Sequence, residues 1–255
     1  MPPSLLAPDT DYLPSKAARK GEFRAYAQLL RLVSRRVGQP PPGRGVPVIL
    51  VPGFIAGDAS LALLGRHLRR RGHRTFSSGV GANLGCTEDM VQRVIRRAER
   101  VGAAEGARVA LVGHSRGGML VKLAAQRRPD LVAAVVVLSA PVTGTLSVAP
   151  HVRRQLEWLF RLNARGLRRV IGQDCVTGEC GGQIAEQLAA PFPADVAYLS
   201  VYSEQDGIID WRTCLDPDAE LVEVASSHTG MGTNPKVLAV VGTRLAQVTR
   251  ADEPD

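Results

Sequence analysis

The chain has 255 residues, of which 45% are hydrophobic and 22% charged, and 32 basic against 24 acidic side chains give a formal net charge of +8. This balance excludes wholesale disorder and collagen-like repeats, and the longest apolar run, 131–138, is far shorter than the roughly 20 residues that span a bilayer. The first residues, MPPSLLAPD, lack a basic segment followed by a long apolar one, so we expect no secretory signal and a cytoplasmic location.

The positive charge raises the question of a nucleic-acid partner. The basic residues are mostly arginines that recur at helical spacing, as at Arg93, Arg96, Arg97 and Arg100, which is typical of a solvated helix face. Aromatic residues make up only 4%, too few for base-stacking platforms. We therefore expect no nucleic-acid partner, while peripheral contact with an anionic membrane stays open. The sequence does not indicate an oligomeric state.

Residues 1–45 are expected to form a helical arm and a linker, followed by one domain over 46–255. The run 40–43, PPPG, cannot continue a helix and predicts the linker. Before it, apolar residues at steps of three and four predict a helix whose apolar stripe consists of Phe23, Tyr26, Leu29, Leu30 and Val33.

From residue 46 onward, strand-like and helix-like segments alternate. The near-continuous apolar run 46–51 is typical of a strand buried on both faces. The alternation predicts an α/β fold, with a mostly parallel sheet of six strands and helices on both faces. The expected strands are 46–51, 74–76, 107–112, 131–138, 196–202 and 220–224, and the expected helices are 59–70, 88–101, 117–126 and 236–248.

The alternation breaks over about 143–191, which we expect to form a cap insertion over one end of the sheet. Its one clear helix carries an apolar stripe beside several arginines. Two interpretations stay open: the stripe packs on the core, or it belongs to a mobile lid that faces a membrane. The apolar residues of the stripe are Leu156, Leu159, Phe160 and Leu162.

The chain has four cysteines, Cys86, Cys175, Cys180 and Cys214. Cys175 and Cys180 could close a small disulfide loop, or the thiols could stay reduced, and both interpretations are open. No CxxC pair occurs, and no cysteines stand at zinc-finger spacing from histidines. The sequence therefore predicts no metal site.

The segment GHSRG, 113–117, follows an apolar strand and leads into an apolar helix. It matches G-x-S-x-G, in which a strained strand-to-helix turn projects a serine hydroxyl above the sheet. Glycines flank the turn because it leaves no room for side chains there, and the helix directs its positive N-terminal end at developing negative charge. The pentapeptide alone is a weak signal, and its place between strand and helix makes Ser115 a candidate nucleophile. A glycine-rich turn without catalysis is the alternative.

A serine needs a base to take its proton and an acid to orient that base. Of the five histidines, His228 fits the base, because it follows the last strand and precedes the last helix. His114, beside the serine, is expected to point away from it, and His151 lies in the cap before any candidate acid.

The segment SEQDGIID offers three acids just after a strand, Glu204, Asp206 and Asp210. Asp206 is the favoured one, because the turn with Gly207 can fold it back beneath an imidazole. A solvated acidic turn is the alternative for all three.

An oxyanion hole needs two backbone N–H donors. Arg116, directly after the serine, supplies one. The loop after the first strand, VPGFIAG, supplies the other, and Phe54 is its best donor, because Pro52 has no N–H.

These motifs together resemble the α/β-hydrolases, closest to the small bacterial lipase and esterase branch. VILVPGF, GHSRGG, SEQDGIID and SSHTGM occur in order over 46–248. The resemblance implies a serine hydrolase that cleaves a small-molecule or lipid carboxylic ester through an acyl-enzyme, without cofactor or metal. It implies Ser115, Asp206 and His228 as the triad and Phe54 and Arg116 as oxyanion donors.

The sequence departs from the family pattern in two places. It has no HGGG loop, and a helix and a proline linker replace the two strands that begin many members. We therefore expect a minimal six-stranded core, with the cap supplying much of an acyl pocket. An acyltransferase with the same triad and an inactive binding protein of the same fold are the alternative functions.

Overall fold

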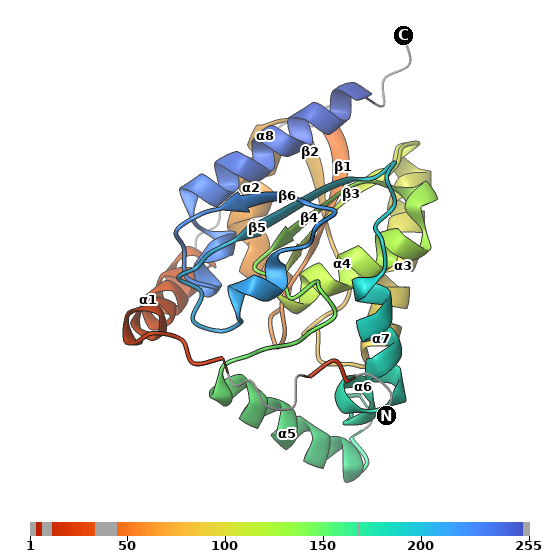
Figure 1. Cartoon of the computed structure of the whole chain (residues 1–255). Helices are drawn as coiled ribbons and strands as arrows, with labels where there is room; N and C mark the ends of the chain where they lie inside the picture. Colours follow the sequence, from red (N-terminus) through yellow and green to blue (C-terminus); the bar gives the residue numbers. More distant parts are fainter. Residues whose placement is uncertain (1–3, 7–11, 34–44, 168, 252–255) are drawn as a thin grey trace.

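A computed structural model describes residues 4–6, 12–33, 45–167 and 169–251. Its centre is one sheet in the order β2-β1-β3-β4-β5-β6, in which all neighbouring strands are parallel (Figure 1). This arrangement confirms the predicted six-stranded α/β core. The strands are β1 (Gly45–Val51), β2 (His73–Ser77), β3 (Val109–His114), β4 (Val132–Leu138), β5 (Ala197–Tyr202) and β6 (Glu220–Glu223).

Helices cover both faces of the sheet. The helices α3 (Thr87–Glu105) and α4 (Arg116–Arg127) cover one face, and α2 (Ala62–Arg70) and α8 (Pro235–Ala251) cover the other (Figure 1). Alternate residues of β1 enter different cores: Ile49 packs beneath α3 and α4, and Leu50 packs beneath α2 and α8. Burial on both faces explains why the run 46–51 is apolar throughout.

Two predicted elements begin two or three residues later in the structure. The expected helix 59–70 begins as a short 3-10 turn, Asp58–Leu61, before α2. The expected strand 107–112 instead begins at Val109, because the end of α3 occupies the residues before it. Gly106 ends that helix in the left-handed conformation (φ 66°), and the Ala107 N–H bonds to the Gly102 carbonyl.

Over the described residues of the cap, 143–167 and 169–191, there are three helices rather than the one expected. They are α5 (Pro150–Ala164), α6 (Asp174–Thr177) and α7 (Glu179–Ala189). Glycine is a poor helix former, so the glycines of α7 concealed it. Their role is close packing: a Cβ on Gly181 would lie 2.5 Å from the Val176 carbonyl oxygen of α6.

The predicted N-terminal helix is present as α1 (Lys16–Val33). The linker 40–43 lies outside the described residues, and so do the side chains of Tyr26, Leu29, Leu30 and Val33. Phe23, the remaining member of the predicted stripe, is 80% exposed.

In the described part of α1, the buried side chains are Ala18 and Glu22. Gly207 approaches this face so closely that a Cβ there would lie 2.7 Å from Glu22 Cγ. In its described part, the helix thus packs on the loop after β5 through a small and a polar side chain.

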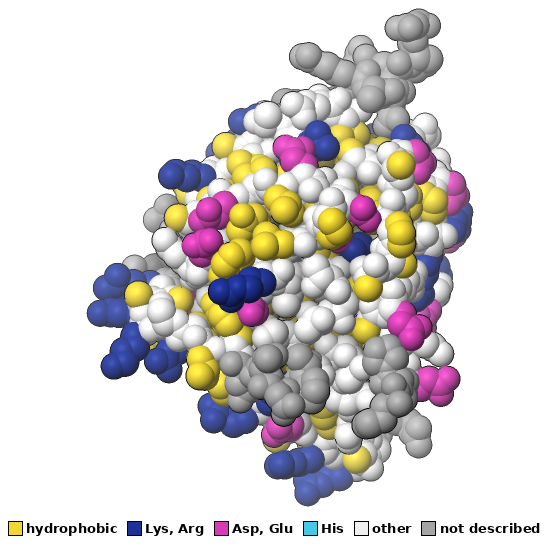
Figure 2. All heavy atoms as spheres, viewed as in Figure 1, with side chains coloured by type: hydrophobic (Ala, Val, Ile, Leu, Met, Phe, Trp, Pro, Cys, Tyr) yellow, Lys and Arg dark blue, Asp and Glu magenta, His cyan; other side chains and the backbone are white. Residues whose placement is uncertain are grey.

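Basic side chains lie on exposed helix surfaces. On the face seen in Figure 2, Lys and Arg gather over α1 and along the outer side of α5. On α3, Arg93, Arg96 and Arg100 are exposed, while Arg97 donates to the Ser77 carbonyl oxygen at 2.9 Å. Among the described residues, no helix is long and apolar enough to cross a membrane.

Candidate active site

Ser115 lies between β3 and α4 in a strained turn. Its φ of 54° and ψ of −126° are unusual for a residue with a side chain. The close packing of this turn explains its glycines. A Cβ on Gly113 would collide with the backbone of Gly117, and one on Gly117 would collide with the Val51 carbonyl. The turn therefore has the geometry of a nucleophile elbow.

The structure brings His228 and Asp206 together in a buried pair. Nδ1 of His228 lies 2.7 Å from Oδ2 of Asp206, and the Asp206 side chain is fully buried. The other carboxylate oxygen accepts hydrogen bonds from the N–H groups of Ile208 (2.8 Å) and Ile209 (3.0 Å). These bonds fix the carboxylate, and the carboxylate in turn orients the imidazole.

The other two candidate acids lie elsewhere. Asp210 caps the 3-10 helix Trp211–Cys214, where Oδ1 accepts a hydrogen bond from the Arg212 N–H at 3.1 Å. Glu204 is exposed to solvent. Of the three acids in this segment, Asp206 is the one that contacts the imidazole.

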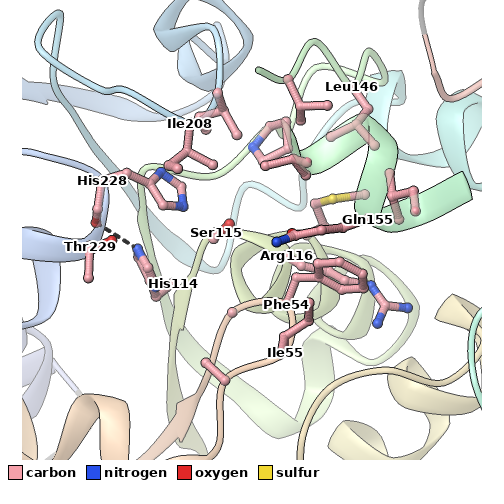
Figure 3. Close-up of a pocket in the computed structure, with 18 of the residues that line it drawn as sticks. Phe54, Ile55, His114, Ser115, Arg116, Leu146, Gln155, Ile208, His228 and Thr229 are labelled. Carbon is pink, nitrogen blue, oxygen red and sulfur yellow. Dashed lines mark hydrogen bonds between the residues drawn. The ribbon is translucent and has the colours of Figure 1, made fainter. Parts of the chain in front are cut away.

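Ser115 and His228 face the same cavity, and the ring of His228 points toward Ser115 (Figure 3). His114 also lines this cavity. Its Nε2–H donates to the His228 carbonyl oxygen at 3.0 Å, and the two ring centroids are 4.7 Å apart. His114 thereby supports the loop that carries His228.

The two imidazoles differ in their pKa. Burial by itself lowers the pKa of His228, but Asp206 and, to a smaller degree, Glu22 outweigh burial, so the pKa lies above its ordinary value of 6.5. Burial, with the positive charge of His228, lowers the pKa of His114 to about 3. The raised pKa makes His228 the more basic of the two rings, while His114 stays neutral at neutral pH.

The two expected oxyanion donors lie at the same cavity. Phe54 and Arg116 both line it, from the loop after β1 and from the first turn of α4. In the described part of the chain, neither backbone N–H donates to a protein acceptor. These groups are thus available to a ligand beside Ser115.

The side chain of Arg116 has a role that the motif did not indicate. It is buried, and its guanidinium donates to the Asn83 carbonyl (2.6 Å), the Gly85 carbonyl (2.6 Å) and Thr87 Oγ1 (3.2 Å). The Asn83 side chain in turn donates a hydrogen bond from Nδ2 to the Pro52 carbonyl oxygen at 2.7 Å. Arg116 therefore ties the elbow to the loop before α3, and through Asn83 to the loop after β1.

Glu22 on α1 is the main site residue that sequence reasoning missed. One carboxylate oxygen accepts hydrogen bonds from the N–H groups of Gly207 (3.1 Å) and His228, and the other accepts from Thr229 (2.8 Å). Glu22 thus joins the loop of Asp206 to the loop of His228. The available signal was its isolation as the single acidic residue in an otherwise basic helix.

The cavity has a volume of about 470 Å³. Its walls come from the loop after β1, the elbow, the loop after β5 and the cap. Most of the side chains from the cap are apolar, and they include Leu146, Val148, Val152, Leu156, Ile171 and Val176. The apolar face of α5 also packs inward through Leu159. A molecule beside Ser115 would therefore meet a largely apolar wall.

Comparisons with known proteins agree with this architecture. Residues 46–170 match the family model of the alpha/beta hydrolase fold. The esterase PIR7B of rice (Oryza sativa subsp. japonica) is 31% identical over 160 residues, which are 59% of the chain and 58% of that esterase. The match thus spans less than two thirds of the relative's length.

Two solved structures share the fold at low sequence identity. A mature lipase of Bacillus licheniformis has a TM-score of 0.59 at 14% identity, covering 85% of the chain and 96% of its own. A soluble variant of the Saccharomyces cerevisiae monoglyceride lipase has a TM-score of 0.56 at 16% identity, and the match covers 86% of the present chain and 90% of the lipase chain. The chain therefore has the α/β-hydrolase fold, as its sequence motifs predicted, and part of it is similar to an esterase.

Proposed function

We propose that this protein is a serine hydrolase that cleaves carboxylic esters through an acyl-enzyme, with Ser115 as nucleophile, His228 as base and Asp206 as the acid that orients it. The observation that carries the proposal is the buried hydrogen bond of 2.7 Å between His228 and Asp206, beside a serine in a strained elbow that opens on the same cavity. A buried carboxylate–imidazole pair directed at a serine is the arrangement that general-base catalysis needs.

The tautomer of His228 follows from its contacts. Nδ1 carries the hydrogen that faces the carboxylate, so Nε2 is the free base. Nε2 takes the proton of Ser115 as Oγ attacks the ester carbonyl, and it returns that proton to the leaving alcohol. Water then repeats the sequence on the acyl-enzyme and releases the acid. The imidazolium formed in each half-reaction is stabilised by Asp206.

The attacked carbonyl oxygen becomes an oxyanion, for which Phe54 and Arg116 supply the proposed N–H donors. Arg116 stands at the N-terminus of α4, where the helix dipole adds positive potential. Its buried guanidinium holds the surrounding loops in place, so the donors are positioned before substrate arrives.

The proposed substrates are esters with an apolar acyl chain. The support is the cap side of the cavity, where apolar residues such as Val152 and Leu156 line the same space as Ser115. Each buried methylene contributes about 0.8 kcal/mol, so a chain that reaches this wall binds better than acetate.

The test is turnover of p-nitrophenyl esters by the wild type and by Ser115→Ala. We expect the variant to lose turnover while its circular dichroism and melting temperature stay close to those of the wild type. Wild-type rates from a folded Ser115→Ala protein would refute the proposed nucleophile.

A further inference from the structure

Three of the four cysteines converge at the seam between the cap and the core. Cys86 immediately precedes α3, Cys175 lies in α6 and Cys180 lies in α7. The Sγ atoms of Cys86 and Cys180 are 3.9 Å apart, and all three Sγ atoms lie within 4.8 Å of one another. All three are free thiols, so three separate elements direct sulfur at one point.

The spacing of these sulfur atoms suits a single thiophilic metal ion. With Zn–S bonds of about 2.3 Å, two sulfur ligands on a tetrahedral ion lie about 3.8 Å apart. The separation of 3.9 Å between the Cys86 and Cys180 Sγ atoms is close to this value, and the other two separations, each at most 4.8 Å, require only small movements of the thiols. A disulfide would join two of the sulfurs and leave the third without a role, whereas a metal uses all three.

We propose that Cys86, Cys175 and Cys180 bind a Zn²⁺ ion that fastens the cap to the core. Three protein ligands leave one position of the tetrahedron for water. The sequence did not predict this site, because its ligands form no CxxC pair and one of them is about ninety residues from the others.

The surroundings balance the charge of such a site. Three thiolates and Zn²⁺ together carry one negative charge, and the buried Arg116 guanidinium lies within electrostatic reach of Cys86 and Cys175. Arg116 also donates to Gly85 and Thr87, the two neighbours of Cys86. Cys175 is buried, while Cys86 and Cys180 are partly exposed, which leaves a path for the ion.

The position of the site indicates what the metal would do. Next to the thiols, the N–H of Ile171 in the cap bonds to the Leu84 carbonyl in the core at 2.6 Å, and α7 packs against α3 (Figure 1). Ile171 and Val176 also line the cavity. A metal at this seam would hold the cavity wall formed by Ile171 and Val176 in place. The cap would then be fixed to the core at this point and would not act as a freely opening lid.

The experiment uses the full chain, reduced with a phosphine, incubated with Zn²⁺ and then desalted. We expect elemental analysis to find one zinc per chain in the wild type and in Cys214→Ala, which changes the cysteine outside the cluster. Cys180→Ser, at a partly exposed ligand, should retain far less zinc. Zinc should raise the melting temperature of the wild type and of Cys214→Ala but not that of Cys180→Ser.

A second measurement needs no variant. Titration of the reduced wild type with Co²⁺ should produce the ultraviolet charge-transfer absorption of thiolate–cobalt bonds, saturating at one equivalent and abolished by excess Zn²⁺. The proposal is overturned if the wild type retains no zinc and gives no such absorption. It is also overturned if Cys180→Ser binds zinc as the wild type does, or if the cluster in the purified protein is a disulfide that mass spectrometry detects.

Discussion

Glu22 lies on α1, outside the family motifs, and it contacts the loops that carry Asp206 and His228. Replacing it by glutamine therefore tests whether this helix supports the proposed catalytic residues. The glutamate accepts three backbone hydrogen bonds, from Gly207, His228 and Thr229, and two of these donors are buried. Glutamine keeps the size of the side chain but has one acceptor oxygen instead of two. Its amide NH₂ group must therefore face at least one of the N–H donors, and that hydrogen bond is lost.

The magnitude follows from the loss of a hydrogen bond to a charged acceptor, about 1.5–3 kcal/mol. For a chain of this size each kcal/mol lowers the melting temperature by about 2–4 °C, so we expect a decrease of roughly 3–12 °C. The activity should fall further than stability alone explains. A displacement of about 1 Å in a catalytic group costs about 100-fold, so kcat/KM should drop by about 10- to 100-fold.

The assay is the pH dependence of kcat/KM well below the melting temperature of the variant. Glu22 raises the pKa of His228, so its neutralisation should move the acidic limb to lower pH. A purely structural role would not move this limb. Arg24→Gln, which changes an exposed charge two residues further along the same helix, is the matched control. Wild-type kcat/KM and an unshifted limb in Glu22→Gln would refute the reasoning.

Three further predictions concern the proposed triad and the cavity. Asp206→Asn should reduce kcat by about 10⁴-fold, as a wrong imidazole tautomer does, whereas Asp210→Asn should change it little; the reverse order would assign the acid to Asp210. Because His228 must be neutral to act as base and its pKa is raised, the acidic limb of the wild-type kcat/KM should lie above pH 6.5, and a limb below that value would contradict the Asp206 contact. Across p-nitrophenyl esters, kcat/KM should rise by up to about fourfold per methylene that the cavity buries. Leu156→Asn should flatten this dependence, and a preference for acetate in the wild type would contradict the proposed acyl pocket.

The four inner strands of the sheet, β1, β3, β4 and β5, were predictable because they are buried on both faces, and a largely apolar run marks such strands directly. The cap was harder to predict. The glycines that conceal α7 serve close packing on α6, and their purpose is visible only once Val176 and Gly181 are in contact. The same holds for α1, whose packing face depends on how closely Gly207 approaches it.

Some residues of the candidate site were likewise predictable from the sequence, and others were not. Ser115, Asp206 and His228 stand in short local motifs whose order along the chain is informative, so the sequence could nominate them. Glu22 and His228 are 206 residues apart in the sequence, and no periodic pattern of residues predicts their hydrogen bond. The pairing of Arg116 with the loop before α3 likewise depends on the tertiary fold.

Labelling with a fluorophosphonate probe tests the central claim most directly, because it detects an activated serine without knowledge of the substrate. We predict that the native wild type gains one phosphonyl group, that peptide mapping places it on Ser115, and that Ser115→Ala and heat-denatured protein gain none. A folded, active wild type that stays unlabelled, or a label on another serine, would contradict the account.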